Sequence, residues 1–153
     1  MNKISKALLR LLILLVLLGV AVMIGVRISA PMLKPDVLGP VNGELRDCPE
    51  KPNCVCSQED PDDPGHLVAP LRADWSAVVE HVKADDATEV VEERDGYLWV
   101  TYQTTVMGYI DDVEFLRAPD VIHVRSASRL GRSDLGANRK RVESIRQAVA
   151  GSE

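Results

Sequence analysis

The feature that most constrains the fold of this chain is an apolar run close to the N-terminus. From Ala7 to Val26 the sequence consists of Leu, Ile, Val, Ala, Met and Gly, with Arg10 as the one charge. A helix of ~20 apolar residues crosses the ~30 Å hydrocarbon core of a bilayer, because each residue advances it by ~1.5 Å. The run predicts a transmembrane helix, with residues 7–26 in the lipid bilayer and residues 1–27 forming the cytoplasmic tip and the anchor.

The charges around the run predict its orientation. Lys3, Lys6 and Arg10 lie at its beginning, whereas Arg27 alone follows it directly. Positive residues accumulate on the cytoplasmic side of membrane helices. We therefore expect a single-pass protein of the inner membrane, with its N-terminus in the cytoplasm and its C-terminal part in the periplasm or otherwise outside the cytoplasm.

A cleaved signal peptide is the main alternative, since a charged start and an apolar run describe both. Ala30 is the residue after which a peptidase would cut, but Ile28 is bulky where a small residue is required, and Pro31 would follow the cut bond. These residues favour an uncleaved signal anchor.

Net charge limits the partners of the rest of the chain. From Ile28 onward there are 14 basic and 23 acidic residues, a net charge of −9. Nucleic acid is therefore not an expected partner, because its binding depends on neutralising phosphates. Seven of the bases lie between Arg125 and Arg146. Glu44 to Asp95, in contrast, contains 15 acidic and 5 basic residues. The basic segment either neutralises this acidic segment within the fold or binds an anion.

Residues 28–70 are predicted to be a proline-rich linker with a cysteine loop, since they contain eight of the nine prolines. Cys48 and Cys54 are six residues apart with two prolines between them, a loop that a disulfide can close. Cys54 and Cys56 would point to opposite faces of an extended chain, so that pair is disfavoured. Cys56 is left over.

A zinc site would need a fourth ligand such as His66, and the spacing matches no standard pattern. We expect no metal and no cofactor.

Residues 71–153 are predicted to form an α+β globular domain. After Asp74, a good N-cap, Trp75, Val78, Val79 and Val82 have the spacing of an amphipathic helix. Four β-rich runs and a last helix follow: residues 88–94, 97–104, 109–116, 121–128 and 135–150. Asp95-Gly96 is a strong signal for a two-residue hairpin. The predicted architecture has two layers, a four-stranded antiparallel meander flanked by two helices.

Alternation along the strands predicts which side chains share a face. If residues 117–120 form the whole loop between the last two strands, Phe115 pairs with Ile122 on the face that meets the helices. The opposite face then carries two charge pairs and is expected to be solvated: Glu114 with His123, and Asp112 with Arg125.

A polar group of residues is predicted where the last two strands meet the last helix. Asn138 lies in phase with apolar residues from Leu135 to Val149, so its amide must find hydrogen-bond partners or cost ~1–3 kcal/mol. The candidate ligand-binding residues are Asp111, Ser126, Ser128, Arg129, Arg132, Asp134 and Asn138. They form either a pocket in which the arginines hold an anion, or a structural network that fixes a loop and caps the helix.

Several motifs of the chain resemble the DUF1499 family, a domain of unknown function. The resemblance extends from Cys48 to Val149 and rests on four groups of residues: Cys48-Pro49; Pro52-Asn53-Cys54-Val55; Asp111-Asp112-Val113-Glu114-Phe115; and Arg125-Ser126-Ala127-Ser128-Arg129 with Gly131, Ser133-Asp134, Gly136 and Asn138-Arg139. It implies export or membrane attachment and no particular activity. Cys56 stands where the family usually has serine.

Three functions remain open. The first is a binding or accessory module facing the cell envelope, whose partner is a small anionic ligand or an envelope protein. The second is an enzyme with Asp111 as acid or base and Arg129 and Arg132 holding an anionic substrate. The third is a purely structural protein. Neither serine has a histidine placed to activate it, so serine hydrolase chemistry is not expected.

Overall fold

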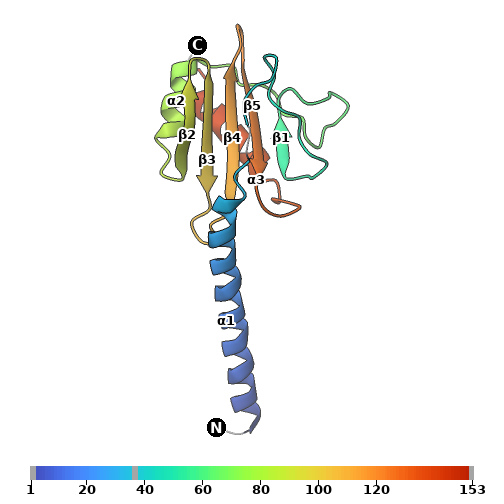
Figure 1. Ribbon diagram of the computed structural model, residues 1–153, viewed down its shortest axis with the longest axis vertical. Coiled ribbons are helices and arrows are strands. Elements are labelled where there is room, and N and C mark those ends of the chain that lie inside the picture. The colour runs from blue at the N-terminus through green and yellow to red at the C-terminus, as the bar shows by residue number, and fades with distance from the viewer. Residues whose placement is uncertain (1–2, 36–37, 152–153) are drawn as a thin grey trace.

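The N-terminal helix stands apart from the rest of the molecule (Figure 1). The computed structural model describes residues 3–35 and 38–151. Helix α1 spans Lys3–Met32 and continues past Arg27 to include Pro31 in its last turn. Within Ile4–Met32 an 18-residue window has a mean hydropathy of 2.9 and none of it is buried, while Ala30 near the end of the helix is buried against the domain. This helix is long and apolar enough to cross a membrane.

The domain is built on a five-stranded antiparallel sheet, not the four-stranded one that the sequence predicted. The strands are β1 (Cys54–Cys56), β2 (Thr88–Arg94), β3 (Tyr97–Gln103), β4 (Ile110–Arg117) and β5 (Ile122–Ser128), in the order β1-β5-β4-β3-β2. The meander of β2 to β5 and the hairpin at Asp95-Gly96 are confirmed. The added strand β1 comes from the predicted linker, and it pairs with the edge of β5.

Two helices cover one face of the sheet (Figure 1). Helix α2 spans Trp75–Lys83 with Asp74 at its N-cap, and α3 spans Ala137–Val149. Their apolar stripes and the inward side chains of the sheet form the main core, which includes Val78, Val82, Leu98, Val113, Phe115, Val124, Val142 and Ile145. Leu135, predicted to belong to the last stripe, lies before the helix begins and is 88% exposed.

The other face of the sheet is covered by residues 38–48, which we call the strap. The strap crosses in front of β4 and β5 (Figure 1), and its Leu45 packs with Cys56, Tyr97 and Trp99 in a second apolar cluster. The expectation of a solvated charged face is therefore wrong. Burial is nearly complete for its three central charged residues: Asp112 is 2% exposed, Glu114 0% and Arg125 7%.

The predicted register between the last two strands is also wrong, by two residues. Phe115 pairs with Val124 and Glu114 with Arg125, because the turn lies one residue later than expected and closes with a 2.9 Å hydrogen bond from the Ala118 N–H to the Val121 carbonyl. A shift of two keeps every side chain on its predicted face, since side chains alternate with a period of two.

Candidate functional site

A pocket of about 290 Å³ lies between two loops at the end of the sheet from which α1 leaves. The loops are residues 104–109, after β3, and residues 129–136, after β5. We call this cavity the loop pocket. Three of the predicted site residues line it: Asp111, Ser128 and Asp134. Much of the remaining wall is apolar and includes Tyr109, Leu130, Leu135 and Ala137.

The amide of Asn138 is fully buried and bonds the Ser128 hydroxyl, which lines the pocket. Its oxygen accepts hydrogen bonds from the Ser126 hydroxyl at 2.5 Å and from the Arg141 guanidinium at 2.7 Å. Its nitrogen donates to the Asn53 carbonyl at 2.9 Å and to the Ser128 hydroxyl at 3.0 Å. Every hydrogen-bonding position of the amide is filled. The in-phase amide that the sequence singled out therefore joins α3 to β5 and to the chain that enters β1.

Asp111 is held by a residue that the sequence did not single out. The Arg141 guanidinium donates to its carboxylate at 2.6 Å, and Asp111 is 4% exposed. The same guanidinium lies 4.6 Å from the centre of the Tyr102 ring, and burial raises the pKa of Tyr102 to about 12. Arg141 follows Asn138 by three residues, so the helical period was the available signal that they share a face.

Arg129 is not in the loop pocket. Its side chain is 5% exposed and lies on the strap side of the sheet. Its Nε and Nη2 donate to the two oxygens of Asp112 at 2.8 and 2.7 Å, and Trp99 Nε1 donates to the same carboxylate at 2.9 Å. Alternation after Ser128 places Arg129 on the face opposite Asn138. The predicted convergence of Arg129 with Asn138 is therefore wrong.

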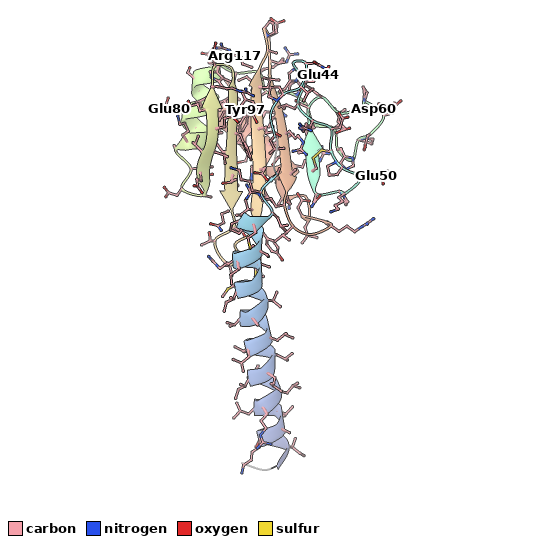
Figure 2. The ribbon with its side chains drawn as sticks, in the orientation of Figure 1. Glu44, Glu50, Asp60, Glu80, Tyr97 and Arg117 are labelled. Carbon is pink, nitrogen blue, oxygen red and sulfur yellow. A yellow bond between two sulfur atoms is a disulfide. The ribbon has the colours of Figure 1, made fainter. Side chains whose placement is uncertain are left out.

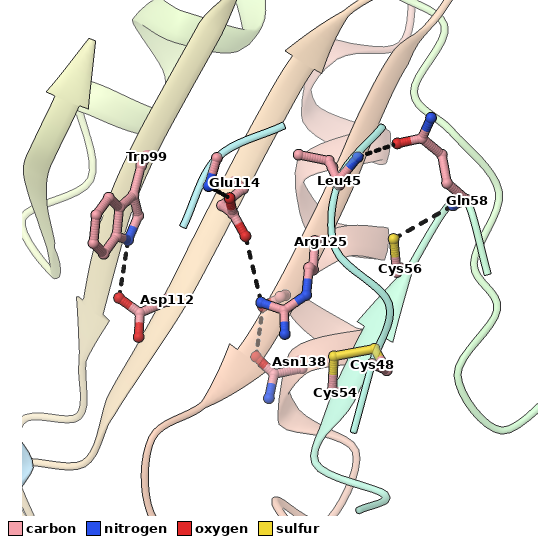
Figure 3. Close-up of polar contacts among 12 residues, drawn as sticks. Leu45, Cys48, Cys54, Cys56, Gln58, Trp99, Asp112, Glu114, Arg125 and Asn138 are labelled. Carbon is pink, nitrogen blue, oxygen red and sulfur yellow. Dashed lines mark hydrogen bonds and ion pairs between the residues drawn. A yellow bond between two sulfur atoms is a disulfide. The ribbon is translucent and has the colours of Figure 1, made fainter. Parts of the chain in front are cut away.

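Glu114 is the centre of a second buried group on the strap side (Figure 3). Its carboxylate accepts from the Gly39 N–H and the Tyr97 hydroxyl, both at 2.8 Å, and from Arg125 at 3.4 Å. Burial and the neighbouring Glu114 carboxylate raise the pKa of Tyr97. Among the described residues, Arg125 Nε is the one buried side-chain nitrogen or oxygen that has no hydrogen-bond partner. The strap is thus fastened to the sheet by polar contacts as well as by Leu45.

The other predicted site residues lie in the loop before α3. The Asp134 carboxylate accepts the Gly136 N–H at 3.0 Å and the Asn138 N–H at 2.7 Å, so it bonds the first turn of α3, although the N-cap residue itself is Gly136. Arg132 is exposed and is not among the residues that line the pocket. Of the other six candidates, Asp111, Ser126, Ser128 and Asp134 gather around Asn138, and the two arginines do not.

Most of the basic segment is used inside the fold. Arg139 donates to the carbonyls of residues 64, 65 and 67, and Arg146 to those of residues 69 and 70. These two arginines of α3 hold the chain between β1 and α2 against the domain. The bonds explain much of the basic cluster without an external anion.

The cysteines divide as predicted. Cys48 and Cys54 form a disulfide with a Cα to Cα distance of 5.6 Å, and Cys56 is a free thiol that is 1% exposed. Burial raises the pKa of the Cys56 thiol, and its sulfur accepts the Gln58 N–H at 3.4 Å (Figure 3). His66 lies elsewhere, between the Asp63 carboxylate at 2.6 Å and the Lys51 carbonyl at 3.1 Å.

The fold and the site define a class of small α+β domain, which is attached to one apolar N-terminal helix and closed by a disulfide next to a buried asparagine. The chain belongs to the DUF1499 family, described as proteins of unknown function, whose model matches residues 44–149. The matched region begins in the strap and includes β1, so the family unit contains the cysteine loop. Comparisons with curated proteins and with solved structures give no match.

Proposed function

We propose that this protein is a single-pass membrane protein whose α+β domain is a non-enzymatic binding module outside the cytoplasm, in the periplasm. Helix α1 supports the membrane span, since all of its leucines, between Leu8 and Leu18, are exposed. The three cations at the start of the apolar run support a cytoplasmic N-terminus. The Cys48–Cys54 disulfide supports an oxidising compartment for the domain.

The observation that carries the binding role is the composition of the loop pocket. Its apolar wall, with Tyr109, Leu130 and Leu135, suits the hydrocarbon part of a ligand. Its polar side is formed by Asp111, Asp134 and the Ser128 hydroxyl. The charge of Asp111 is paired with Arg141, whereas the Asp134 carboxylate accepts only backbone N–H groups among the described residues and leaves the pocket negative. Carboxylates repel an anion and accept hydrogen bonds. The pocket therefore favours an amphiphile with a cationic or hydroxyl headgroup over the small anion that the sequence suggested.

Binding is favoured over catalysis by the way Asp111 is held. A general acid or base must reach the proton that it transfers, and the Asp111 carboxylate is 4% exposed and paired with Arg141. Among the described residues that line the pocket there is no histidine or cysteine that would activate a hydroxyl or act as a nucleophile. The pocket offers shape and hydrogen-bond acceptors for a ligand.

The proposal is tested with hexylammonium and hexanoate, two probes of equal chain length and opposite charge. Binding is measured by saturation-transfer NMR on the full chain in nanodiscs of deuterated lipid. Ala137→Trp places a large side chain in the pocket. Ala148→Trp is the matched control, because it adds the same side chain at an exposed position of the same helix, away from the pocket.

We expect hexylammonium to bind roughly tenfold more tightly than hexanoate, which is the effect of about 1.4 kcal/mol of charge interaction at a partly screened site. Ala137→Trp should abolish this binding and Ala148→Trp should not. Equal signals from the two variants would show that the pocket is not the site, and tighter binding of hexanoate would support the anionic ligand instead.

A further inference from the structure

The end of the domain from which α1 leaves exposes large apolar side chains. We call this end, formed by loops 104–109 and 129–136, the proximal end. Val106 is 70% exposed, Tyr109 37% and Leu135 88%. The two loops flank the end of α1 in Figure 1, and both contribute to the loop pocket. Tyr109 and Leu135 line the same pocket, and exposed apolar side chains gathered at one end of a domain mark an interaction site more reliably than single scattered residues.

Loop 104–109 is attached directly to α1. The Arg27 guanidinium donates to the carbonyl of Thr105 and, at 3.1 Å, to that of Val106. Gly108 has φ +74°, and a Cβ at this position would lie 2.6 Å from Arg27 Cγ. The glycine thus permits both the left-handed turn and the close approach of the loop to the helix. These contacts fix the position of the proximal end along the helix axis.

That position is level with the end of the apolar run. Arg27 follows Val26, the last residue of the run, and a helix rises ~1.5 Å per residue. Val106, whose carbonyl Arg27 binds, therefore lies within about one helical turn of the hydrocarbon boundary. The headgroup region adds only about 5–7 Å on each side of the hydrocarbon core. When α1 crosses a bilayer, the proximal end is in contact with the headgroups.

The exposed side chain of Leu135 contributes nothing to packing in the core of the domain. The φ of +55° at Leu135 is a left-handed conformation that is unfavourable for a leucine, and its side chain, at the rim of the loop pocket, is 88% exposed. The loop on which it stands is anchored by the Asp134 contacts to α3 and by the Asn53 amide, which donates to the Gly131 carbonyl at 3.1 Å. A braced loop therefore presents Leu135 outward.

We propose that the proximal end is a membrane-contact surface, in which Val106 and Leu135 insert into the headgroup and upper acyl region of the outer leaflet. This rests on the membrane span in the proposed function. Of the labelled acids, Glu44 and Asp60 lie away from this end (Figure 2). Asp85, Asp86 and Glu89 line a cavity beside it with Arg27, so the contact rests on the apolar side chains and not on attraction between charges. The loop pocket consequently opens beside the lipid, where an amphiphilic ligand is concentrated.

The test places an environment-sensitive NBD fluorophore at single introduced cysteines. Leu135→Cys probes the proximal end, Leu14→Cys probes the middle of α1, and Asp120→Cys probes the β4–β5 turn at the opposite end. The full chain is reconstituted in phosphatidylcholine and phosphatidylglycerol nanodiscs with or without lipid that carries a nitroxide high on its acyl chain. Cys56 is 1% exposed and should not react, and labelling of the wild-type chain measures this background.

We expect nitroxide lipid to quench the probes at positions 14 and 135 at least about threefold more than the probe at 120, since interfacial side chains sit ~5–10 Å into the boundary region. Strong quenching at 14 with quenching at 135 no greater than at 120 would overturn the membrane-contact surface and leave the anchor intact. Weak quenching at position 14 would overturn the anchor and this surface together. Thermal unfolding curves of the three variants verify that each is folded.

Discussion

Replacing Asn138 with alanine is expected to destabilise the domain strongly, because one buried amide connects three segments that are distant in sequence. The substitution removes four hydrogen bonds at once, to Asn53, Ser126, Ser128 and Arg141. The carbonyl, hydroxyls and guanidinium that remain are enclosed by the same walls. They lose their partner and do not regain full hydration.

The magnitude follows from the number and type of these bonds. Three involve neutral groups and contribute about 1 kcal/mol each, and the bond from Arg141 contributes about 1.5–3 kcal/mol. Alanine has a higher helix propensity than asparagine by about 0.6 kcal/mol, which offsets part of the loss. Since neighbouring contacts do not add fully, we expect the free energy of unfolding to fall by about 4 kcal/mol. That is a large share of the 5–15 kcal/mol typical of a domain.

The assay is urea unfolding of the full chain in detergent micelles, followed by the fluorescence of Trp75 and Trp99, which both lie in the domain. Gln147→Ala is the matched control, since it removes an exposed amide from the same helix, and it should change the unfolding free energy by less than about 0.5 kcal/mol. A loss below about 1 kcal/mol for Asn138→Ala, with an unchanged denaturant slope, would refute the role assigned to the amide.

Three further contacts are tested by unfolding, the first with a matched control and the last by heat instead of urea. Asp112→Ala leaves a guanidinium buried without its partner and should cost about 3–5 kcal/mol, whereas Asp95→Ala breaks an exposed pair and should cost less than about 1 kcal/mol. Cys48→Ser removes the disulfide between two cysteines six residues apart. The unfolding free energy should fall by about 2 kcal/mol, because the unfolded chain regains loop entropy. His66→Gln should lower the melting temperature more at about pH 5.5 than at about pH 8.

The sign of the pH effect follows from the direction of the shift. The hydrogen bond to the Asp63 carboxylate raises the pKa of His66 above its ordinary value of 6.5. The stabilisation is therefore fully present below the unfolded pKa and is lost as the pH rises through the folded pKa. A His66→Gln variant with the same melting-temperature deficit at both pH values would contradict this pH effect. Equal losses for Asp112→Ala and Asp95→Ala would contradict the difference expected between a buried and an exposed ion pair.

The sequence was sufficient for the parts of the fold that depend on local periodicity. The stripes of α2 and α3, the hairpin at Asp95-Gly96 and the inward amide of Asn138 were all predicted from spacing. The ends of the four predicted strands, β2 to β5, were placed within about two residues, which is the usual uncertainty at element ends. The error at Leu135 has the same origin, because a left-handed turn at Leu135 and Gly136 delays the start of the helix to Ala137.

The parts that were missed depend on contacts between distant segments. Strand β1 has three residues, two of them cysteines, and it exists because it completes the edge of β5. The strap buries Asp112 and Glu114, although alternation alone marks their face as polar and hence solvated. The position of Arg129 follows from that burial, since its partner is Asp112. Periodicity carries no information about which remote segment covers a face.

The most direct measurement of the membrane placement is labelling of introduced cysteines by a membrane-impermeant maleimide in spheroplasts that express the full chain. Asp120→Cys lies in the domain, and Ser5→Cys lies before the apolar run. We predict that Asp120→Cys reacts in intact spheroplasts and that Ser5→Cys reacts only after lysis, with both proteins in the membrane fraction. The reverse pattern, or a soluble product that begins near Pro31, would contradict an uncleaved anchor with the domain outside.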